Sequence, residues 1–268
     1  MVLRHRVALD GVQLDSVDDR IMISRVETGD GKENISTVSL WGDGTGSRVT
    51  AMHRDSIDIT VKFRIRVKKR DMSDREEVLE KVNAWAAAGG VLTTNIKPGR
   101  KITVFRAQAA GAGDPWEWTK EYSIIFRACG IPYWQEDTPA TKSVTSTDGT
   151  SASLTVGGSE KTVMDVSFKN TSGESCGTFS IGNGENTLSF TDLGLASGET
   201  LVIDHKDTGK LCVLRIRIKS ALGVWRSAMD KHSPTSDNDL LTTPGTKTVT
   251  MSAAKTGDFT VSASGRFA

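Results

Sequence analysis

The clearest pattern in the chain is the strict alternation of apolar and polar residues over positions 57–67. Every odd position in this range is apolar, and the even positions include the basic residues Lys62, Arg64 and Arg66. Successive side chains of a strand point to opposite faces, so the alternation predicts a long strand with one buried and one cationic face.

One stretch of the chain has the signature of an amphipathic helix. Ser73 and Glu76 have the spacing of a capping box, and Gly89-Gly90 is a typical stop signal, so we expect a helix over about residues 74–88. Its predicted apolar face comprises Val78, Leu79, Val82, Trp85 and Ala86. Burying this face would dock the helix on a sheet, with Trp85 in the core rather than at a ligand site.

Shorter apolar segments on both sides of the helix predict further strands. These segments are residues 21–27, 102–107 and 121–127. Glycine-rich sequences at 42–48 and 109–115 are expected to be loops.

The composition changes near residue 138. Twelve of the twenty-five residues from 138 to 162 are Ser or Thr, which marks either a linker or the solvated first strands of a second domain. We therefore predict two domains, residues 1–137 and 138–268. The second has no helical pattern, and turn sequences divide its apolar segments, which favours an antiparallel sandwich or jelly roll. The expected fold class is mainly β, with two sandwich-like domains and a single packed helix in the first.

The charge distribution argues against a general nucleic-acid binder. The chain carries 21 Lys and Arg against 20 Asp and Glu up to Asp137, and 13 against 13 beyond it. A protein that neutralises phosphates would carry a basic surplus in its binding domain. Hydrophobic residues make up 37% and charged residues 25%, which is ordinary for a globular chain and unlike a disordered one.

Cysteine usage and hydropathy indicate a protein made in a reducing compartment. Cys129, Cys176 and Cys212 lie far apart and have no histidine partner at zinc-site spacing, so neither a metal centre nor a disulfide framework is expected. No segment has the apolar length of a signal peptide or a membrane span. We expect assembly in a cytoplasm, without a cofactor.

No constellation of residues predicts catalysis, so the chain is not expected to be an enzyme. It has no G-x-S-x-G sequence, and its four histidines lie in unrelated contexts. Asp204-His205 is the nearest approach to an acid–base pair, but adjacent strand residues point to opposite faces, and we predict a surface histidine beside a turn. Residues 42–46 lack the lysine of a phosphate-binding loop, and Asp207-Thr208-Gly209 lacks calcium-ligand spacing, so both are predicted to be structural turns or loops.

The basic residues of the long strand have two interpretations. Lys62, Arg64 and Arg66 continue into the basic residues 68–70, and such a stripe is usually a solvated face. Alternatively, Lys62, Arg64 and Arg66 form a subunit interface with carboxylates of a neighbouring copy, because a long strand with an unpaired outer face is suited to assembly.

The joint order of these elements resembles the siphophage distal tail protein (Dit) family. In the first half, a long alternating strand precedes a helix with a Trp, two strands and a closing Ile131-Pro132-Tyr133-Trp134. In the second half, residues 165–170, 201–210 and 239–249 are similar to the family's C-terminal sandwich in order and spacing. The Ser/Thr-rich stretch 141–155 departs from the family's pattern, which bears on how the two domains pack.

The resemblance implies a structural virion protein at a tail tip. Its N-terminal domains would form a homohexameric ring between the tail tube protein and the baseplate hub or tail-associated protein. The C-terminal domain would be galectin-like and would project outward, where in some members it carries a receptor-binding protein. The second domain is too short for a large insertion, so the resemblance implies a plain adaptor.

A carbohydrate-binding module for host-surface attachment is the alternative function, because a fold alone does not fix a function. The aromatic residues of the second half are Trp225, Phe168, Phe179, Phe190, Phe259 and Phe267. Most of them fall in strand patterns that would bury them, which leaves Trp225 as the candidate sugar contact.

Overall fold

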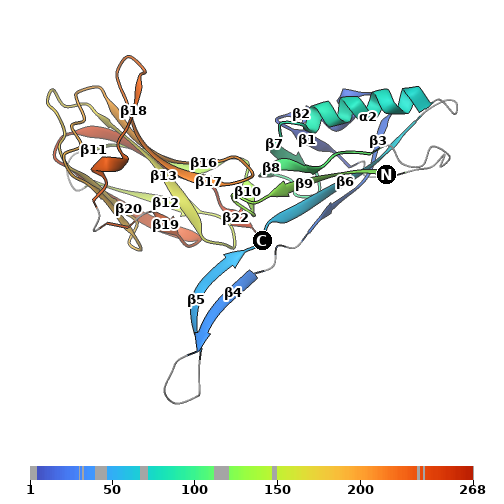
Figure 1. Cartoon of the computed structure of the whole chain (residues 1–268). Helices are drawn as coiled ribbons and strands as arrows, with labels where there is room; N and C mark the ends of the chain where they lie inside the picture. Colours follow the sequence, from blue (N-terminus) through green and yellow to red (C-terminus); the bar gives the residue numbers. More distant parts are fainter. Residues whose placement is uncertain are drawn as a thin grey trace. The chain divides into compact units, whose positions relative to one another are not determined.

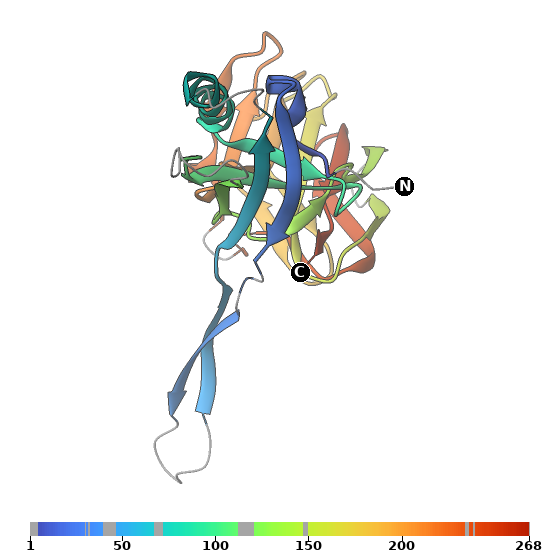
Figure 2. The same cartoon turned by 90° about the vertical axis from the view of Figure 1, so that its right-hand side faces the viewer.

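The chain folds into two compact units, each built mainly from antiparallel strands (Figures 1 and 2). The computed structural model describes residues 5–29, 31, 33–39, 47–66, 72–111, 121–146, 150–233, 236–237 and 239–267. Unit 1 comprises Met1–Trp134, the segment Asp207–Cys212 and Ala268, and unit 2 comprises Gln135–Lys206 and Val213–Phe267. The predicted mainly β fold class is confirmed.

Unit 1 is organised around one sheet. Its strands are β1 (Val7–Leu9), β2 (Val12–Gln13), β3 (Ile21–Thr28), β4 (Glu33–Ser39), β5 (Ser47–Arg54), β6 (Ile57–Ile65), β7 (Gly90–Thr94), β8 (Arg100–Gln108) and β9 (Tyr122–Ala128), and its helices are α1 (Leu14–Val17) and α2 (Met72–Ala86). The sheet has the order β2-β1-β7-β8-β9-β6-β3, so β2 and β3 are its edge strands. The one-turn helix α1 was not predicted from the sequence.

The long alternating strand is β6, which pairs with β3 on one side and β9 on the other. Its apolar residues Ile57, Ile59, Val61 and Phe63 are 2% exposed or less. The opposing β9 residues Tyr122, Ile124, Phe126 and Ala128 are buried as well. The period-two pattern therefore builds one face of the core, as predicted, although the strand ends at Ile65 and Val67 lies outside the described residues.

Helix α2 covers a face of this sheet (Figures 1 and 2). The helix begins at Met72, so Ser73 lies in its first turn and the prediction of Ser73 as the cap is wrong. At the other end Gly89 has φ +68°, a conformation that glycine adopts without strain. Trp85 is half-buried: its ring meets Phe126 edge-on at 5.9 Å, and its Nε1 donates to the Val12 carbonyl at 3.1 Å.

Unit 2 is a sandwich of two sheets around one core. Its strands are β11 (Ala140–Ser146), β12 (Ser151–Val156), β13 (Thr162–Asn170), β14 (Phe179–Gly182), β15 (Thr187–Phe190), β16 (Thr200–Asp207), β17 (Cys212–Lys219), β18 (Trp225–Ser227), β19 (Leu241–Thr242), β20 (Gly245–Ala253), β21 (Gly257–Ala263) and β22 (Arg266–Phe267), with a 3₁₀ turn at Met229–Lys231. β10 (Trp134–Glu136) lies where the chain passes between the units. The sheet orders are β11-β21-β13-β16-β17-β18 and β12-β20-β14-β15.

Aromatic side chains fill the space between the two sheets of unit 2. Phe168, Phe179, Phe190 and Phe259 are at most 1% exposed, and the rings of Phe168 and Phe179 stack at 4.9 Å. The Ser/Thr-rich stretch is not a linker but the strands β11 and β12, and on β12 every second residue is buried. The many Ser and Thr residues of this stretch are explained by the solvated outer faces of these strands, where hydroxyl groups can contact water.

Candidate functional surfaces

The cationic residues of β6 lie on the face opposite the core and differ in their partners. Lys62 Nζ donates to Glu27 Oε1 on β3 at 2.9 Å, and this hydrogen bond holds the pKa of Glu27 below its ordinary value. Arg64 Nε lies 4.0 Å from Glu121 Oε1, and its side chain is 59% exposed. Lys62 is thus engaged within the unit, whereas Arg64 reaches into solvent. The basic residues 68–70 lie outside the described residues.

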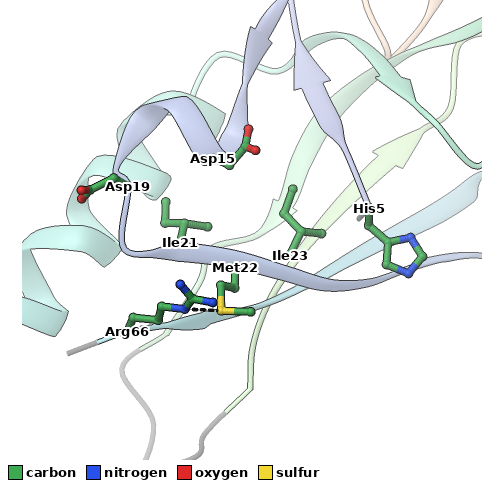
Figure 3. A pocket seen from close by; sticks show the side chains of 7 residues that line it. All are labelled: His5, Asp15, Asp19, Ile21, Met22, Ile23 and Arg66. Atoms are coloured by element: carbon green, nitrogen blue, oxygen red, sulfur yellow. Dashed lines mark hydrogen bonds between the residues drawn. The ribbon is translucent and has the colours of Figure 1, made fainter. Parts of the chain in front are cut away.

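A pocket of about 280 Å³ lies beside the edge strand β3 (Figure 3). Its lining residues are His5, Asp15, Asp19, Ile21, Met22, Ile23 and Arg66. The guanidinium of Arg66, just after β6, contacts the sulfur of Met22. The pocket therefore joins an apolar strand edge to side chains of both charges, which makes this border of the sheet a candidate contact surface.

Strands β4 and β5 form a two-stranded sheet of their own, with pairs running from Glu33↔Arg54 to Ser39↔Ser47 (Figure 1). Among the described residues, no other strand pairs with this hairpin. An isolated hairpin is marginally stable in water, and its unpaired backbone groups are a template for another chain. The hairpin is a second candidate contact surface, which the sequence analysis missed.

The side chain of His205 is almost fully covered and bridges two carboxylates, so the prediction of a surface histidine is wrong. Its side chain is 7% exposed, its Nδ1 lies 2.9 Å from Asp165 Oδ1, and its Nε2 lies 2.9 Å from Asp239 Oδ1. Burial alone would lower the pKa of His205, but the hydrogen bonds to Asp165 and Asp239 outweigh it and raise the pKa to about 9. Both ring nitrogens are occupied, which suits a structural bridge rather than a catalytic base.

Asp204 points away from His205, as the alternation of a strand requires. Its carboxylate accepts hydrogen bonds from Arg215 and Arg217 of β17. Arg217 in turn lies over the ring of Trp225, with its Cζ 4.2 Å from the ring centroid. Trp225 is 44% exposed, so the candidate sugar contact lies at the surface beside a cationic cluster.

The remaining candidates from the sequence are a turn, a glycine-rich segment and three cysteines. Asp207 Oδ1 accepts the N–H of Gly209 at 2.8 Å, and Gly209 has φ +75°, so Asp207-Thr208-Gly209 is a turn as predicted. Residues 42–46 lie outside the described residues, and Cys129, Cys176 and Cys212 form no disulfide bond. Within the described part of the chain, no group of three His, Cys, Asp or Glu is arranged to hold a metal ion, and no helix is long and apolar enough to cross a membrane.

No family model and no curated protein matches this chain. Among solved structures, the Dit protein of phage SPP1 matches over 98% of this chain and 99% of its own, with a TM-score of 0.65 and 15% sequence identity. The chain has the fold of SPP1 Dit. Chains of the phage p2 baseplate in its activated conformation, with Sr and with Ca, match with TM-scores of 0.52 and 0.51 at 6% identity, over 98% of both chains.

The resemblance inferred from the order of elements is confirmed at the level of the fold. The cationic strand, the pocket and the hairpin all belong to unit 1, and Trp225 and His205 belong to unit 2. No local sequence motif predicted the bridge at His205, because its partners Asp165 and Asp239 lie 40 and 34 residues away in the sequence.

Proposed function

We propose that this chain is a non-enzymatic structural protein of a phage tail tip, whose copies form a hexameric ring that joins the tail tube to the baseplate hub. The observation that carries the proposal is the end-to-end likeness to SPP1 Dit, a protein described as a paradigm of the hub adsorption apparatus in phages that infect Gram-positive bacteria. The likeness spans both units, which a single common sandwich would not produce. The chain would be assembled in the host cytoplasm and end in the virion tail.

In this proposal, residues 1–137 form the ring and residues 138–268 form the outer domain. A cyclic ring needs a heterologous interface, in which one patch of a subunit meets a different patch of the next. Unit 1 offers two unlike surfaces of this kind: the β4–β5 hairpin, with unpaired backbone groups, and the β3 border of the sheet, with its pocket. If the hairpin of one subunit paired with the β3 border of the next, the backbone hydrogen-bonding groups of the hairpin would find partners and the border would be covered. Such a contact needs no active site.

The cationic strand adds charge to that interface. Arg64 and Arg66 would meet carboxylates of the neighbouring subunit, while Lys62 contributes less because Glu27 already engages it. Complementary charges at a subunit contact fix its register and disfavour wrong partners. The double variant Arg64→Glu/Arg66→Glu places like charges there and is expected to abolish the ring.

Sedimentation velocity over a range of protein concentrations tests the interface. The unmodified chain is expected to form a hexamer at high concentration, and the double variant is expected to stay monomeric with an unchanged melting temperature. Lys142→Glu/Lys161→Glu, which reverses two exposed cations of unit 2, is the matched control and should assemble normally. Hexamers of the Arg64/Arg66 variant would remove these residues from the interface, and a chain that stays monomeric without any substitution would contradict the ring itself.

A carbohydrate-binding module is the second candidate, and the exposure of Trp225 favours it. A sugar ring would stack on the open face of the indole, while Arg217 covers the other face. A glycan array probed with the unmodified chain and with Trp225→Ala tests this function. Binding that the substitution abolishes would support the module, and an array without specific signals would exclude it.

A further inference from the structure

The β17–β18 hairpin lies at one edge of unit 2 (Figure 1). It exposes several apolar side chains. Leu222 and Val224, in its turn, are 94% and 67% exposed, and Trp225 and Met229, which follow, are 44% and 50% exposed. β18 is the last strand of its sheet, so one side of its backbone has no strand partner among the described residues. Clustered apolar surface beside an open strand edge is typical of a protein contact.

The outer face of this hairpin has a surplus of positive charge. Lys219 lies opposite Trp225 and Arg217 lies opposite Ser227 in the strand register, and Arg215 lies on the same face two residues earlier. One carboxylate, Asp204, serves both arginines, and Lys219 Nζ lies over the Trp225 ring at 5.7 Å. Three cations against one carboxylate leave two positive charges unneutralised on this face.

A shallow pocket of about 360 Å³ lies between these side chains. The side chains that give it its chemistry are Arg215, Arg217, Trp225, Arg226, Ser227 and Met229. Their polar side-chain groups are guanidiniums and one hydroxyl. Arg226 is paired with Glu199, whereas Arg215 and Arg217 share the single carboxylate of Asp204, so the lining still mainly donates hydrogen bonds. Such a lining fits a ligand that brings acceptors, and guanidinium groups bind carboxylates best.

We propose that this surface binds an acidic, extended segment of a partner protein. The segment would pair with the free edge of β18, place its carboxylates against Arg217 and Lys219, and pack apolar side chains on Trp225 and Met229. The inference rests on the proposed function only in taking the partner to be a protein of the same tail. The binding itself is a property of the isolated chain.

Two other occupants fit this surface less well. A sugar would leave the apolar side chains of Leu222 and Val224 without a partner, and Arg217 already covers one face of the Trp225 ring. A second copy of the chain, docked through the same surface by two-fold symmetry, would bring the surplus cations of both copies together. An acidic, extended protein segment would form hydrogen bonds with the β18 edge, cover the exposed apolar side chains and neutralise the surplus cations.

Selection of peptides from a random linear library on the purified full chain tests the proposal. We expect enrichment of sequences in which Asp or Glu alternates with apolar residues. Trp225→Ala, Lys219→Glu and Leu222→Asp should each weaken binding of a selected peptide by about tenfold or more, as central contact residues do. Leu222 is almost fully exposed, so its substitution leaves the fold intact even if another variant does not. Ile96→Ala, which removes an apolar residue of unit 1 that is 43% exposed, is the control.

Each other outcome overturns the proposal. These outcomes are the absence of acidic sequences among the selected peptides, peptide binding that survives Trp225→Ala and Leu222→Asp, and glycan binding in place of peptide binding. Self-association that Trp225→Ala abolishes, without peptide binding, would assign the surface to a second copy instead. A chain that forms rings but selects no acidic peptide refutes this inference alone, and one that selects them but forms no ring refutes the proposed function alone.

Discussion

The bridge between His205 and its two carboxylates makes the stability of unit 2 depend on pH. His205 lies on β16, Asp165 lies on β13, and Asp239 precedes β19, so protonated His205 ties three segments of the chain together. The substitution His205→Gln removes the positive charge and keeps a side chain able to form hydrogen bonds. It isolates the contribution of the charge.

The magnitude follows from the pKa of His205. A rise from the ordinary 6.5 to about 9 corresponds to about 3 kcal/mol of stabilisation. Because the pKa is raised in the folded state, this contribution is complete below about pH 6.5 and is lost as the pH rises through about 9. The pKa of Asp239 is lowered, mainly by its hydrogen bond to His205. The stabilisation that ionised Asp239 contributes is therefore present above its ordinary pKa of 3.8 and is lost as the pH falls below that value.

Thermal unfolding followed by circular dichroism from pH 6 to pH 10 measures this contribution. At pH 6, His205→Gln is expected to lower the melting temperature of unit 2 by about 10 °C, and the difference should shrink to a small remainder near pH 10. Leu201→Ala, which truncates a fully buried side chain on the same strand, is the control. It should lower the melting temperature by an amount that does not change with pH. A difference between His205→Gln and the unmodified chain that stays constant from pH 6 to pH 10 would mean that the charge of His205 does not stabilise unit 2.

Two further predictions concern the core and a turn of unit 2. Phe179→Ala removes a ring that stacks on Phe168, and should lower the free energy of unfolding by about 3–5 kcal/mol in a urea titration; a loss below about 1 kcal/mol would mean that the core does not depend on this ring. Asn183 is buried, and its Oδ1 accepts the N–H groups of Glu185 and Asn186, so Asn183→Ala should cost about 1–3 kcal/mol in the same titration; an unchanged midpoint would show that water replaces the side chain.

Local periodicity was sufficient to predict the elements that build the cores. The alternation before Val67 gave β6, the helical spacing of Val78 and Val82 gave α2, and strand patterns placed the phenylalanines of unit 2 inside. Each of these signals lies within a few residues of sequence, because burial on one face of a strand or helix repeats with the period of that element.

Features that depend on distant partners were not predictable from one sequence. The β4–β5 hairpin shows no clean alternation of apolar and polar residues in the sequence, so periodicity did not predict it. The burial of His205 depends on Asp165 and Asp239, which only the folded sandwich brings to it. The prediction that Asp204 and His205 point to opposite faces was right. The partners of each side chain could not be predicted, because they come from other segments of the chain, which local spacing does not relate to β16.

The proposed ring depends on identical copies of this chain closing through unit 1. Electron microscopy of the concentrated, purified protein would reveal such a ring. We expect annular particles with a central opening and six-fold symmetric class averages. Fields that contain only single molecules at every concentration, or symmetric dimers without an opening, would contradict it.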